Sequence, residues 1–256
     1  MQAPNVLERD TWIRLPCVGV VIPSYNEAAT VGAVVRLALA QPEVQEVIVV
    51  DDGSEDTTWE TLQLVLAEDH RVQRMRHSEN RGKGAALRTG FQKVTAPIVI
   101  VQDADREYDP AEYAVLVKPI LDGKADVVFG SRFLGGGSHR VLYYWHSVGN
   151  KIITTFSNMC TNLNLTDIEV GFKAFRREIL QKVNLRENRF GIEPEFTAKI
   201  ARLNGVRIYE VPISYHGRTY AEGKKIGWRD GIAALWHIIN YNFIRLEKKR
   251  TSRSSG

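Results

Sequence analysis

Uninterrupted apolar runs that alternate with helical patterns are the feature of this sequence that most limits its fold. Four such runs, VGVVIP, EVIVVDD, PIVIVQD and ADVVFGS, are separated by longer segments with helical spacing, among them residues 30–40, 57–67 and 84–94. The runs lack the polar alternation of a strand with one solvent-facing side, so both faces of each strand must be covered. We therefore predict an α/β fold with a mainly parallel central sheet and helices on both sides.

The second half of the chain is less regular. The rhythm stops at the glycine-rich turn LGGGSH, and residues 145–161 then show a helical pattern. Residues 166–227 mix short elements and loops, and residues 228–246 predict an amphipathic helix. We expect one domain over residues 1–231, followed by an appendage, residues 232–256, that holds the amphipathic helix and a basic tail.

Charge and cysteine content exclude several classes of protein. The net charge of +4 is mild, and much of the excess lies in the tail RLEKKRTSRSSG. Without a second basic stripe we expect no nucleic-acid partner, and instead a solvated tail or one attracted to an acidic membrane surface. Cys17 and Cys160 lack metal-ligand spacing, which favours packed thiols in a reducing compartment. No apolar run approaches the roughly 18 residues that predict a membrane span.

Polar residues follow each predicted strand of the first half. The five stretches are PSYNE, DDGSED, ENRGKGAA, DAD and GSR. Ligands of parallel α/β sheets bind beyond the carboxyl ends of the strands, so five polar strand ends predict one shared site. Each stretch also has a plainer interpretation, since Asn26, Ser54 and Asp56 could cap helices and Gly53 could serve a turn.

Asp103 and Asp105 decide between these interpretations. Two carboxylates at i and i+2 on an extended chain point to one face and repel each other unless a cation neutralises them. Carboxylate oxygens suit Mg²⁺ or Mn²⁺, which usually bind together with a substrate phosphate. Glu107 continues the spacing and could be a third ligand.

Three other phosphate-binding classes fit the sequence poorly. The first strand is not followed by G-x-G-x-x-G, which argues against a dinucleotide oxidoreductase, and no G-x-x-x-x-G-K-[ST] is present to mark a P-loop. Phosphatases that form an aspartyl phosphate carry their two aspartates after the first strand, whereas this pair follows the fourth.

The ordered motifs resemble the family 2 glycosyltransferases, which have the GT-A fold. They are VVIPSYNEAATV, VIVVDDGSEDTT, NRGKGAALRTGF, VIVQDADREYDP and DVVFGSRF. Within that family the sequence is most similar to the dolichol-phosphate mannose synthase and polyprenyl-phosphate glucosyltransferase group, over about residues 18–231. The resemblance implies a Rossmann-like, nucleotide-sugar-binding GT-A domain.

The resemblance also implies roles for residues of the first half. The donor-binding residues would be Pro23, Tyr25, Glu27, Asp51, Asp52, Lys83 and Asp103. Asp103 and Asp105 would bind the metal, Mg²⁺ or Mn²⁺, on the donor diphosphate. Glu107 occupies a position, two residues beyond the motif DAD, where the family often has Gln, so the metal site would be more acidic than usual.

In the second half, GSRF places Arg132 where the family contacts an acceptor phosphate. The segment TDIEVGFKAFRRE nominates Asp167 and Lys173, and the loop EVPISYHGRTYAEGKKIGWRDG nominates cations for the diphosphate, namely Arg218, Lys224 and Lys225. We expect Asp105, Arg132 and Asp167 to be the catalytic residues. The lysines could also be ordinary solvated side chains.

The function implied is metal-dependent, inverting transfer of a hexose from a nucleotide diphosphate sugar to a polyprenyl or dolichyl phosphate. GDP-mannose and UDP-glucose both remain open as donors. An ionised lipid phosphate needs no strong general base, and no obvious base is present. A sugar or other hydroxyl acceptor would need a carboxylate base such as Asp167 or Glu193. A binding module without turnover is the alternative of another class.

Many relatives of this group carry transmembrane helices after the catalytic domain, whereas this chain has the segment 228–246. Apolar residues gather on one side of that helix, at Trp236, Ile239, Phe243 and Leu246. Its aromatic residues, Trp228, Trp236, Tyr241 and Phe243, favour either core packing or a membrane interface. We expect a cytoplasmic protein that is peripheral on the cytoplasmic membrane face, alone or through a membrane partner protein.

Overall fold

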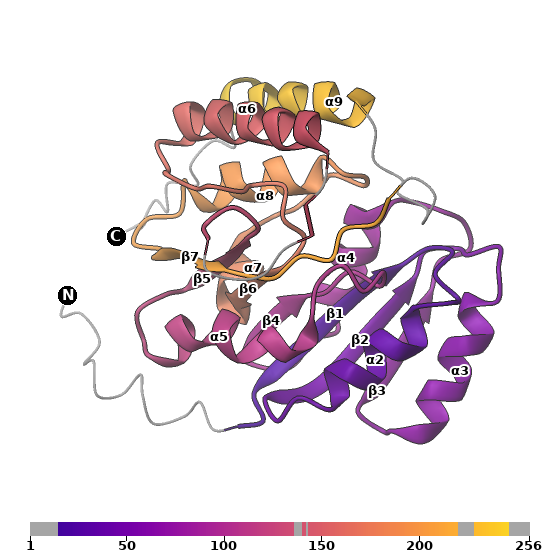
Figure 1. The fold of residues 1–256 in the computed structure, drawn as a ribbon. Helices are drawn as coiled ribbons and strands as arrows, with labels where there is room; N and C mark the ends of the chain where they lie inside the picture. Colours follow the sequence, from indigo (N-terminus) through magenta and orange to yellow (C-terminus); the bar gives the residue numbers. More distant parts are fainter. Residues whose placement is uncertain (1–14, 136–139, 142, 220–227, 246–256) are drawn as a thin grey trace, which may run out of the picture.

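A seven-stranded sheet forms the centre of the computed structural model, which describes residues 15–135, 140–141, 143–219 and 228–245 (Figure 1). Its strands are β1 (Val18–Ser24), β2 (Val44–Asp51), β3 (Val72–Arg76), β4 (Ile98–Val101), β5 (Val127–Ser131), β6 (Lys173–Arg176) and β7 (Ile208–Pro212). They lie in the order β3-β2-β1-β4-β6-β5-β7. Only β6 is antiparallel to its neighbours, β4 and β5. The predicted α/β fold with a mainly parallel sheet is confirmed.

Helices follow most of the strands. They are α2 (Val31–Leu39), α3 (Thr58–Glu68), α4 (Lys83–Phe91), α5 (Tyr113–Leu121), α6 (Tyr144–Thr161), α7 (Arg177–Lys182), α8 (Ile192–Ile200) and α9 (Trp228–Ile239). A 3-10 turn, Pro110–Glu112, precedes α5, and a π-helical turn, Asn240–Ile244, follows α9. The helices expected from periodicity are present, with ends that differ by a few residues.

The core lies on both faces of the sheet. Successive residues of β1, β2, β4 and β5 are buried, as their unbroken apolar sequences predict. Helix α4 packs closely on β1, because a Cβ on Gly90 would lie 2.3 Å from Cγ1 of Val21. This close packing fixes the position of Lys83 at the first turn of α4.

A further layer of helices, α6, α8 and α9, lies over the part of the sheet that contains β6 (Figure 1). Phe196 of α8 packs edge-on against Phe175 of β6, with ring centroids 4.5 Å apart. Helices α6 and α9 pack on α8 and on each other, and they form the upper edge of the molecule in Figure 1. No helix in the described part of the chain is long and apolar enough to span a membrane.

The C-terminal segment differs from the single helix that we predicted over residues 228–246. The α-helix ends at Ile239, the next five residues form the π-helical turn, and Leu246 lies outside the described residues.

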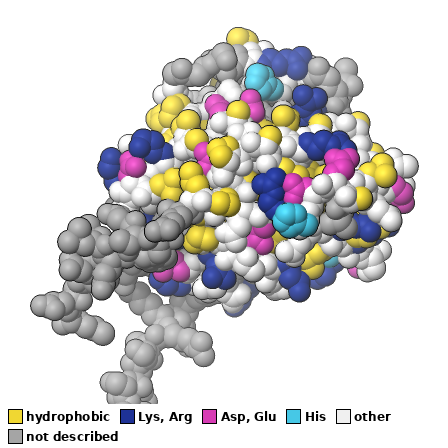
Figure 2. Space-filling model, turned by 90° about the horizontal axis from the view of Figure 1, so that it is seen from below, with side chains coloured by type: hydrophobic (Ala, Val, Ile, Leu, Met, Phe, Trp, Pro, Cys, Tyr) yellow, Lys and Arg dark blue, Asp and Glu magenta, His cyan; other side chains and the backbone are white. Residues whose placement is uncertain are grey.

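The cysteines are free thiols, as expected, with Cys17 buried and Cys160 half-buried. The side of the molecule that faces away from α6 and α9 is seen from below in Figure 2. It has lysine, arginine, aspartate and glutamate side chains interspersed with hydrophobic ones.

Candidate active site

The loops that follow β1 and β2 are joined by hydrogen bonds through Asn26. Its backbone N–H donates to Oγ of Ser54 (2.9 Å), and its Oδ1 accepts from the backbone N–H of Glu55 (2.9 Å). Asn26 has a positive φ of 52°, a conformation that asparagine tolerates better than most residues. Asn26 and Ser54 therefore link two strand ends and are not helix caps, since the N-cap positions of α2 and α3 are Thr30 and Thr57.

Asp52 holds the loop that leads into α4. Its carboxylate accepts hydrogen bonds from the backbone N–H groups of Arg81 (3.1 Å) and Gly82 (2.6 Å), and it lies 2.6 Å from Nδ1 of His77. Asp51 is fully buried, accepts from the N–H of Ser54 (3.0 Å) and pairs with Nε of Arg76 at 3.1 Å. Both predicted donor-binding aspartates thus fix the surrounding loops.

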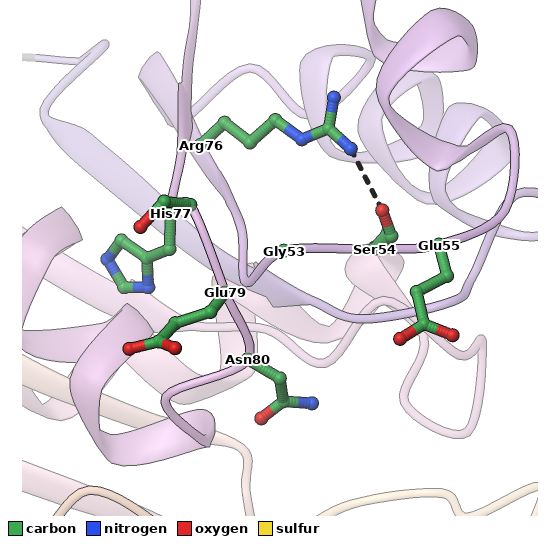
Figure 3. Close-up of a pocket in the computed structure, with 8 residues that line it drawn as sticks. Gly53, Ser54, Glu55, Arg76, His77, Glu79 and Asn80 are labelled. Carbon is green, nitrogen blue, oxygen red and sulfur yellow. Dashed lines mark hydrogen bonds between the residues drawn. The ribbon is translucent and has the colours of Figure 1, made fainter.

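A cavity of about 670 Å³ opens at the carboxyl ends of β2 and β3 (Figure 3). Gly53, Ser54 and Glu55 line one side, and residues 76–80 line the other. Nη2 of Arg76 donates to the carbonyl oxygen of Ser54 across it (2.9 Å). The cavity has the size and the polar lining of a small-molecule site.

Asp103 and Asp105 lie beyond β4, and each faces a cation from another part of the chain. Nζ of Lys83 lies 2.8 Å from Asp103, and Nη2 of Arg218 lies 2.7 Å from Asp105. Arg218 also pairs with Glu27, at 3.0 Å. Motifs separated by more than a hundred residues therefore meet at the predicted acidic pair.

Burial, together with the charges of Asp103 and Glu107, raises the pKa of Asp105 to about 6. Burial alone lowers the pKa of Lys83, but the negative charges of Asp103 and Glu193 outweigh it and raise that pKa above its ordinary value. The acids thus concentrate negative charge around Asp103 and Asp105. Concentrated carboxylate charge of this kind favours binding of a divalent cation.

Gly171 leaves room for the pair between Lys83 and Asp103. A Cβ at this position would lie 2.3 Å from Oδ2 of Asp103 and 3.0 Å from Nζ of Lys83. The segment that carries Asp167 therefore approaches the acidic pair as closely as a backbone can.

Glu107 does not form a three-carboxylate cluster with Asp103 and Asp105. Its side chain accepts from the hydroxyl of Tyr215 (2.9 Å) and from the backbone N–H of Arg218 (2.8 Å), so it holds the segment after β7 that carries Arg218. Among the residues that the structure describes, no group of three or more His, Cys, Asp or Glu side chains is arranged to hold a metal ion. Glu107, predicted as a third metal ligand, is thus engaged with Tyr215 and Arg218.

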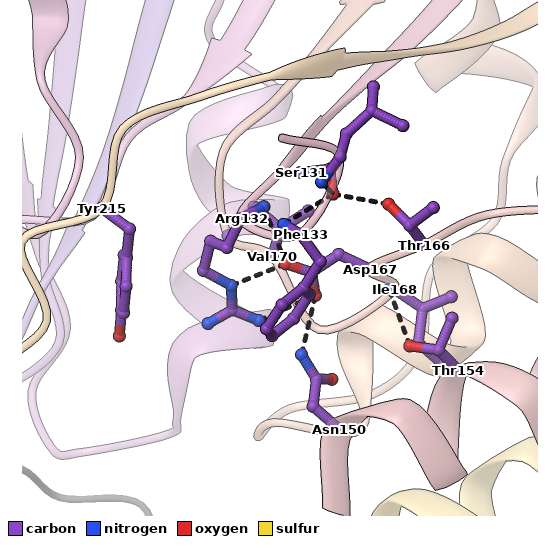
Figure 4. A network of polar contacts seen from close by, with 12 residues as sticks. Ser131, Arg132, Phe133, Asn150, Thr154, Thr166, Asp167, Ile168, Val170 and Tyr215 are labelled. Atoms are coloured by element: carbon purple, nitrogen blue, oxygen red, sulfur yellow. Dashed lines mark hydrogen bonds and ion pairs between the residues drawn. The ribbon is translucent and has the colours of Figure 1, made fainter. Parts of the chain in front are cut away.

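A second polar cluster lies beyond β5 (Figure 4). Arg132 donates from Nε and Nη2 to the two carboxylate oxygens of Asp167, at 2.6 and 2.8 Å, and Asn150 of α6 donates to the same carboxylate (3.1 Å). The guanidinium carbon of Arg132 lies 5.1 Å from the ring centroid of Tyr215. Burial lowers the pKa of Arg132, but the charge of Asp167 raises it further, to well above its ordinary value.

Lys173 does not face a phosphate, contrary to our expectation. It is buried, and its ammonium group donates to Glu193 and to the carbonyl of Val170. Lys173 points into the protein because it lies on β6, which is enclosed between β4 and β5. The sequence pattern does not reveal that β6 occupies this position. Glu193 lies 3.4 Å from Lys83 and so connects this interior pair to the acidic pair.

Glu169 is a charged residue of this region that we did not predict. Its Oε1 is buried and has no hydrogen-bond partner within the described residues. Burial, with the charge of Glu193, raises its pKa to about 7. An acid inside the otherwise apolar stretch IEVGF was the available signal.

Of the remaining predicted site residues, two lie in the described part of the chain and two lie outside it. Pro23 and Tyr25 are partly buried at the end of β1, next to Glu27. Lys224 and Lys225 lie outside the described residues.

Comparison with known proteins identifies similar sequences. The family model described as "Glycosyl transferase family 2" matches residues 19–183. Polyprenol monophosphomannose synthase of Mycolicibacterium smegmatis is 32% identical over 216 residues, which cover 81% of this chain and 80% of its own. Undecaprenyl-phosphate mannosyltransferase of Micrococcus luteus is 32% identical over 237 residues, 84% of this chain and 94% of its own.

A solved structure shares the fold. Glucosyl-3-phosphoglycerate synthase of Mycobacterium tuberculosis, crystallised with Mn²⁺, uridine diphosphate and glucosyl-3-phosphoglycerate, aligns with a TM-score of 0.69 at 20% identity. The alignment covers 94% of this chain and 84% of that one. The GT-A fold that the sequence motifs implied is confirmed.

Proposed function

Because this chain belongs to glycosyl transferase family 2, we propose that it transfers a hexose from a nucleotide diphosphate sugar to a polyprenyl or dolichyl phosphate. The observation that carries the proposal is that both acids predicted as candidate bases, Asp167 and Glu193, are paired with cations. Asp167 is neutralised by Arg132, and Glu193 by Lys173 and Lys83. A hydroxyl acceptor needs a free base, whereas a phosphate acceptor is already ionised.

The nucleotide would occupy the cavity between the loops after β2 and β3. Asp51 and Asp52 would hold those loops, while Pro23, Tyr25 and Glu27 would lie along the adjacent strand end. Lys83, Arg218 and the undescribed Lys224 would neutralise the diphosphate. These cations favour departure of the nucleotide diphosphate, because negative charge develops on it in the transition state.

Mg²⁺ or Mn²⁺ fits the acidic pair. Asp103 and Asp105 would hold it, and it would supply charge neutralisation to the donor diphosphate when bound. Lys83 and Arg218 each pair with one of the two carboxylates. Glu107, predicted as a third ligand, would contribute through its hold on Arg218.

The acceptor phosphate would meet the cluster of Arg132, Asn150 and Asp167. Arg132 would attract the phosphate, while Asp167 and Asn150 keep the guanidinium in a fixed position. Direct attack of a phosphate oxygen on the anomeric carbon would invert its configuration. The two relatives named for lipid-linked mannose support this acceptor class.

A screen of nucleotide sugars tests the proposal. The chain is incubated with GDP-mannose or UDP-glucose and a short-chain polyprenyl phosphate, with Mn²⁺, with Mg²⁺ or with a chelator. We expect formation of a polyprenyl glycosyl phosphate that depends on the metal. Its anomeric configuration, determined by NMR, should be opposite to that of the donor. Binding of donors without any product would instead indicate a binding module.

The enzyme would act as a peripheral protein at the cytoplasmic face of a membrane, because its acceptor lies there. Residues 1–231 would carry the chemistry, and residues 232–256, which begin within α9, would serve the membrane contact. Fractionation of cells before and after a high-salt wash tests this placement.

A further inference from the structure

Glu169 has no hydrogen-bond donor in a region where the neighbouring acids are paired. Its Oε1 is buried, and no described residue donates a hydrogen bond to it. By contrast, Asp167 accepts from Arg132, and Asp103 lies 2.8 Å from Nζ of Lys83. Leaving a buried carboxylate without a donor costs free energy, so a ligand that supplies a donor would stabilise it.

The segment that carries Glu169 contacts both charged clusters of the site. Two residues before it, Asp167 is paired with Arg132 (Figure 4). Two residues after it, a Cβ on Gly171 would lie 3.0 Å from Nζ of Lys83. The intervening residues are apolar and fully buried, namely Ile168, Val170 and Phe172. Glu169 therefore stands between the contact with Arg132 and the contact with Lys83.

Lys173, the lysine nearest to Glu169 in the sequence, already uses its donors elsewhere. A lysine ammonium group has three N–H donors. That of Lys173 donates to the carboxylate of Glu193 and to the carbonyl oxygens of Ile168 and Val170. Lys173 therefore has no donor left for Glu169, although its positive charge still acts on it.

The electrostatic surroundings of Glu169 favour a ligand that donates hydrogen bonds. Burial and the charge of Glu193 raise the pKa of Glu169, the charges of Lys173 and Arg132 lower it, Asp167 raises it again, and the pKa is about 7. Hydrogen bonds donated to a carboxylate favour its ionised form. A ligand with hydroxyl groups would therefore stabilise the charge that burial disfavours.

The transferred sugar has the chemistry and the position that Glu169 requires. In the proposed reaction it lies between the donor diphosphate, near Lys83, and the acceptor phosphate, near Arg132. Sugar hydroxyl groups donate hydrogen bonds, and bonds to an ionised carboxylate are stronger than those between neutral groups. Glu169 is half-buried, and the broad terminal torsion of glutamate lets its carboxylate turn toward an incoming hydroxyl.

We propose that Glu169 binds a hydroxyl group of the transferred sugar and so helps to select the hexose of the donor. The inference rests on the proposed function, which puts the sugar between the two phosphate groups. A general base would instead take a proton from the acceptor, and removing a base would slow transfer from every donor alike.

Isothermal titration of the full chain at saturating Mn²⁺ tests the contact with the sugar. The ligand pairs are GDP-mannose with GDP and UDP-glucose with UDP. Glu169→Ala should weaken binding of the nucleotide sugar that the wild type prefers by about 10- to 100-fold, because a hydrogen bond to a charged group is lost. The Kd of the matching nucleotide diphosphate should not change. Thermal unfolding checks that the variant is folded.

Glu178→Ala is the matched control. Glu178 is exposed on α7, which follows the antiparallel strand β6 and so lies at the edge of the sheet opposite to the site. This variant should bind both ligands of each pair as the wild type does. An unchanged Kd of the nucleotide sugar in Glu169→Ala would overturn the inference.

Donor analogues that each lack a single hydroxyl group identify the contact. One analogue should bind the wild type about 10- to 100-fold more weakly than the parent sugar does, and Glu169→Ala should bind that analogue and the parent equally. The other analogues should keep their wild-type differences in the variant. If Glu169→Ala weakened the parent and all analogues by the same factor, the role of Glu169 would be structural and the inference would be wrong.

Transfer to a short-chain polyprenyl phosphate distinguishes this inference from the proposed function. Selective binding of one sugar through Glu169 without any transfer would contradict the proposed function and leave the sugar contact supported. Loss of kcat in Glu169→Ala, with every Kd unchanged, would identify a base and overturn the inference.

Discussion

The two charged clusters of the site are built in different ways. At the proposed donor side, formed by Glu27, Lys83, Asp103, Asp105 and Arg218, acids pair with cations from distant parts of the chain. At the acceptor side, formed by Arg132, Asn150 and Asp167, one bidentate ion pair is enclosed, with Asp167 fully buried. The donor pairs are suited to exchange partners when a metal and a diphosphate bind, whereas the acceptor pair is suited to stay fixed.

This difference predicts which substitutions should reduce catalysis without reducing stability. Removing an acid from the donor side should affect turnover more than folding, because several other charges remain nearby. Removing the acid of the acceptor side should affect both, because a buried cation would lose its partner.

Asp105→Ala is expected to have the largest effect. We predict a loss of activity on the order of 10³-fold, since the metal and the diphosphate would lose a ligand, with little change in the melting temperature. Steady-state rates at saturating metal, together with thermal unfolding, measure both. A variant that turns over at the wild-type rate in the presence of chelator would refute the metal assignment.

Asp167→Asn should sharpen the contrast from the acceptor side. It keeps the shape of the side chain but leaves Arg132 unpaired, which costs about 3 kcal/mol or more of unfolding free energy. The KM for the polyprenyl phosphate should rise, while the Kd for the nucleotide donor stays the same. Denaturant unfolding and donor titration check the two parts, and equal weakening of donor and acceptor would remove the distinction between the two sides.

Gly171→Ala tests the point at which the two sides approach each other. The added methyl group would overlap Asp103, so we expect a loss of about 1–3 kcal/mol in stability and a lower rate. Gly149→Ala on α6 is the matched control, because its Cβ would meet nothing within 4 Å. That control should be neutral or slightly stabilising. Equal effects at the two glycines would show that the close approach is unimportant.

Glu169→Gln should change stability only at higher pH. The folded-state pKa of Glu169 is raised from 4.5 to about 7, so the ionised acid destabilises the fold increasingly as pH rises between these values. The variant should match the wild type near pH 4 and exceed its stability by about 1–3 kcal/mol above pH 7. Unfolding free energies across this range measure the effect, and a constant difference at every pH would exclude the titration of Glu169 as its cause.

Local sequence patterns predicted most of the donor side. Short continuous stretches of sequence contain the apolar runs of β1, β2 and β4 and the polar residues that follow them. Asp103 and Asp105 lie close to each other beyond β4, as their spacing predicts. The cations that meet these acids, Lys83 and Arg218, are also predicted, but by the resemblance to a family and not by the spacing.

The acceptor side was harder to predict because its features depend on contacts between distant segments. The position of β6 between β4 and β5 turns Lys173 inward to Glu193, and no local pattern specifies that pairing. Glu169 was missed for the same reason. In α9 the periodicity identified an amphipathic helix, but it did not reveal that Trp236 is exposed while Ala234 and Ile238 are packed.

The central claim is that the acceptor oxygen belongs to a phosphate, because the two acids predicted as candidate bases, Asp167 and Glu193, are already paired with cations. A competition assay tests it most directly. The chain, Mn²⁺ and its preferred nucleotide sugar are mixed with equal amounts of a short-chain polyprenyl phosphate and the matching polyprenol, and the products are identified by mass spectrometry. The account predicts glycosyl phosphate product alone, and glycosylated polyprenol at a comparable rate would contradict it.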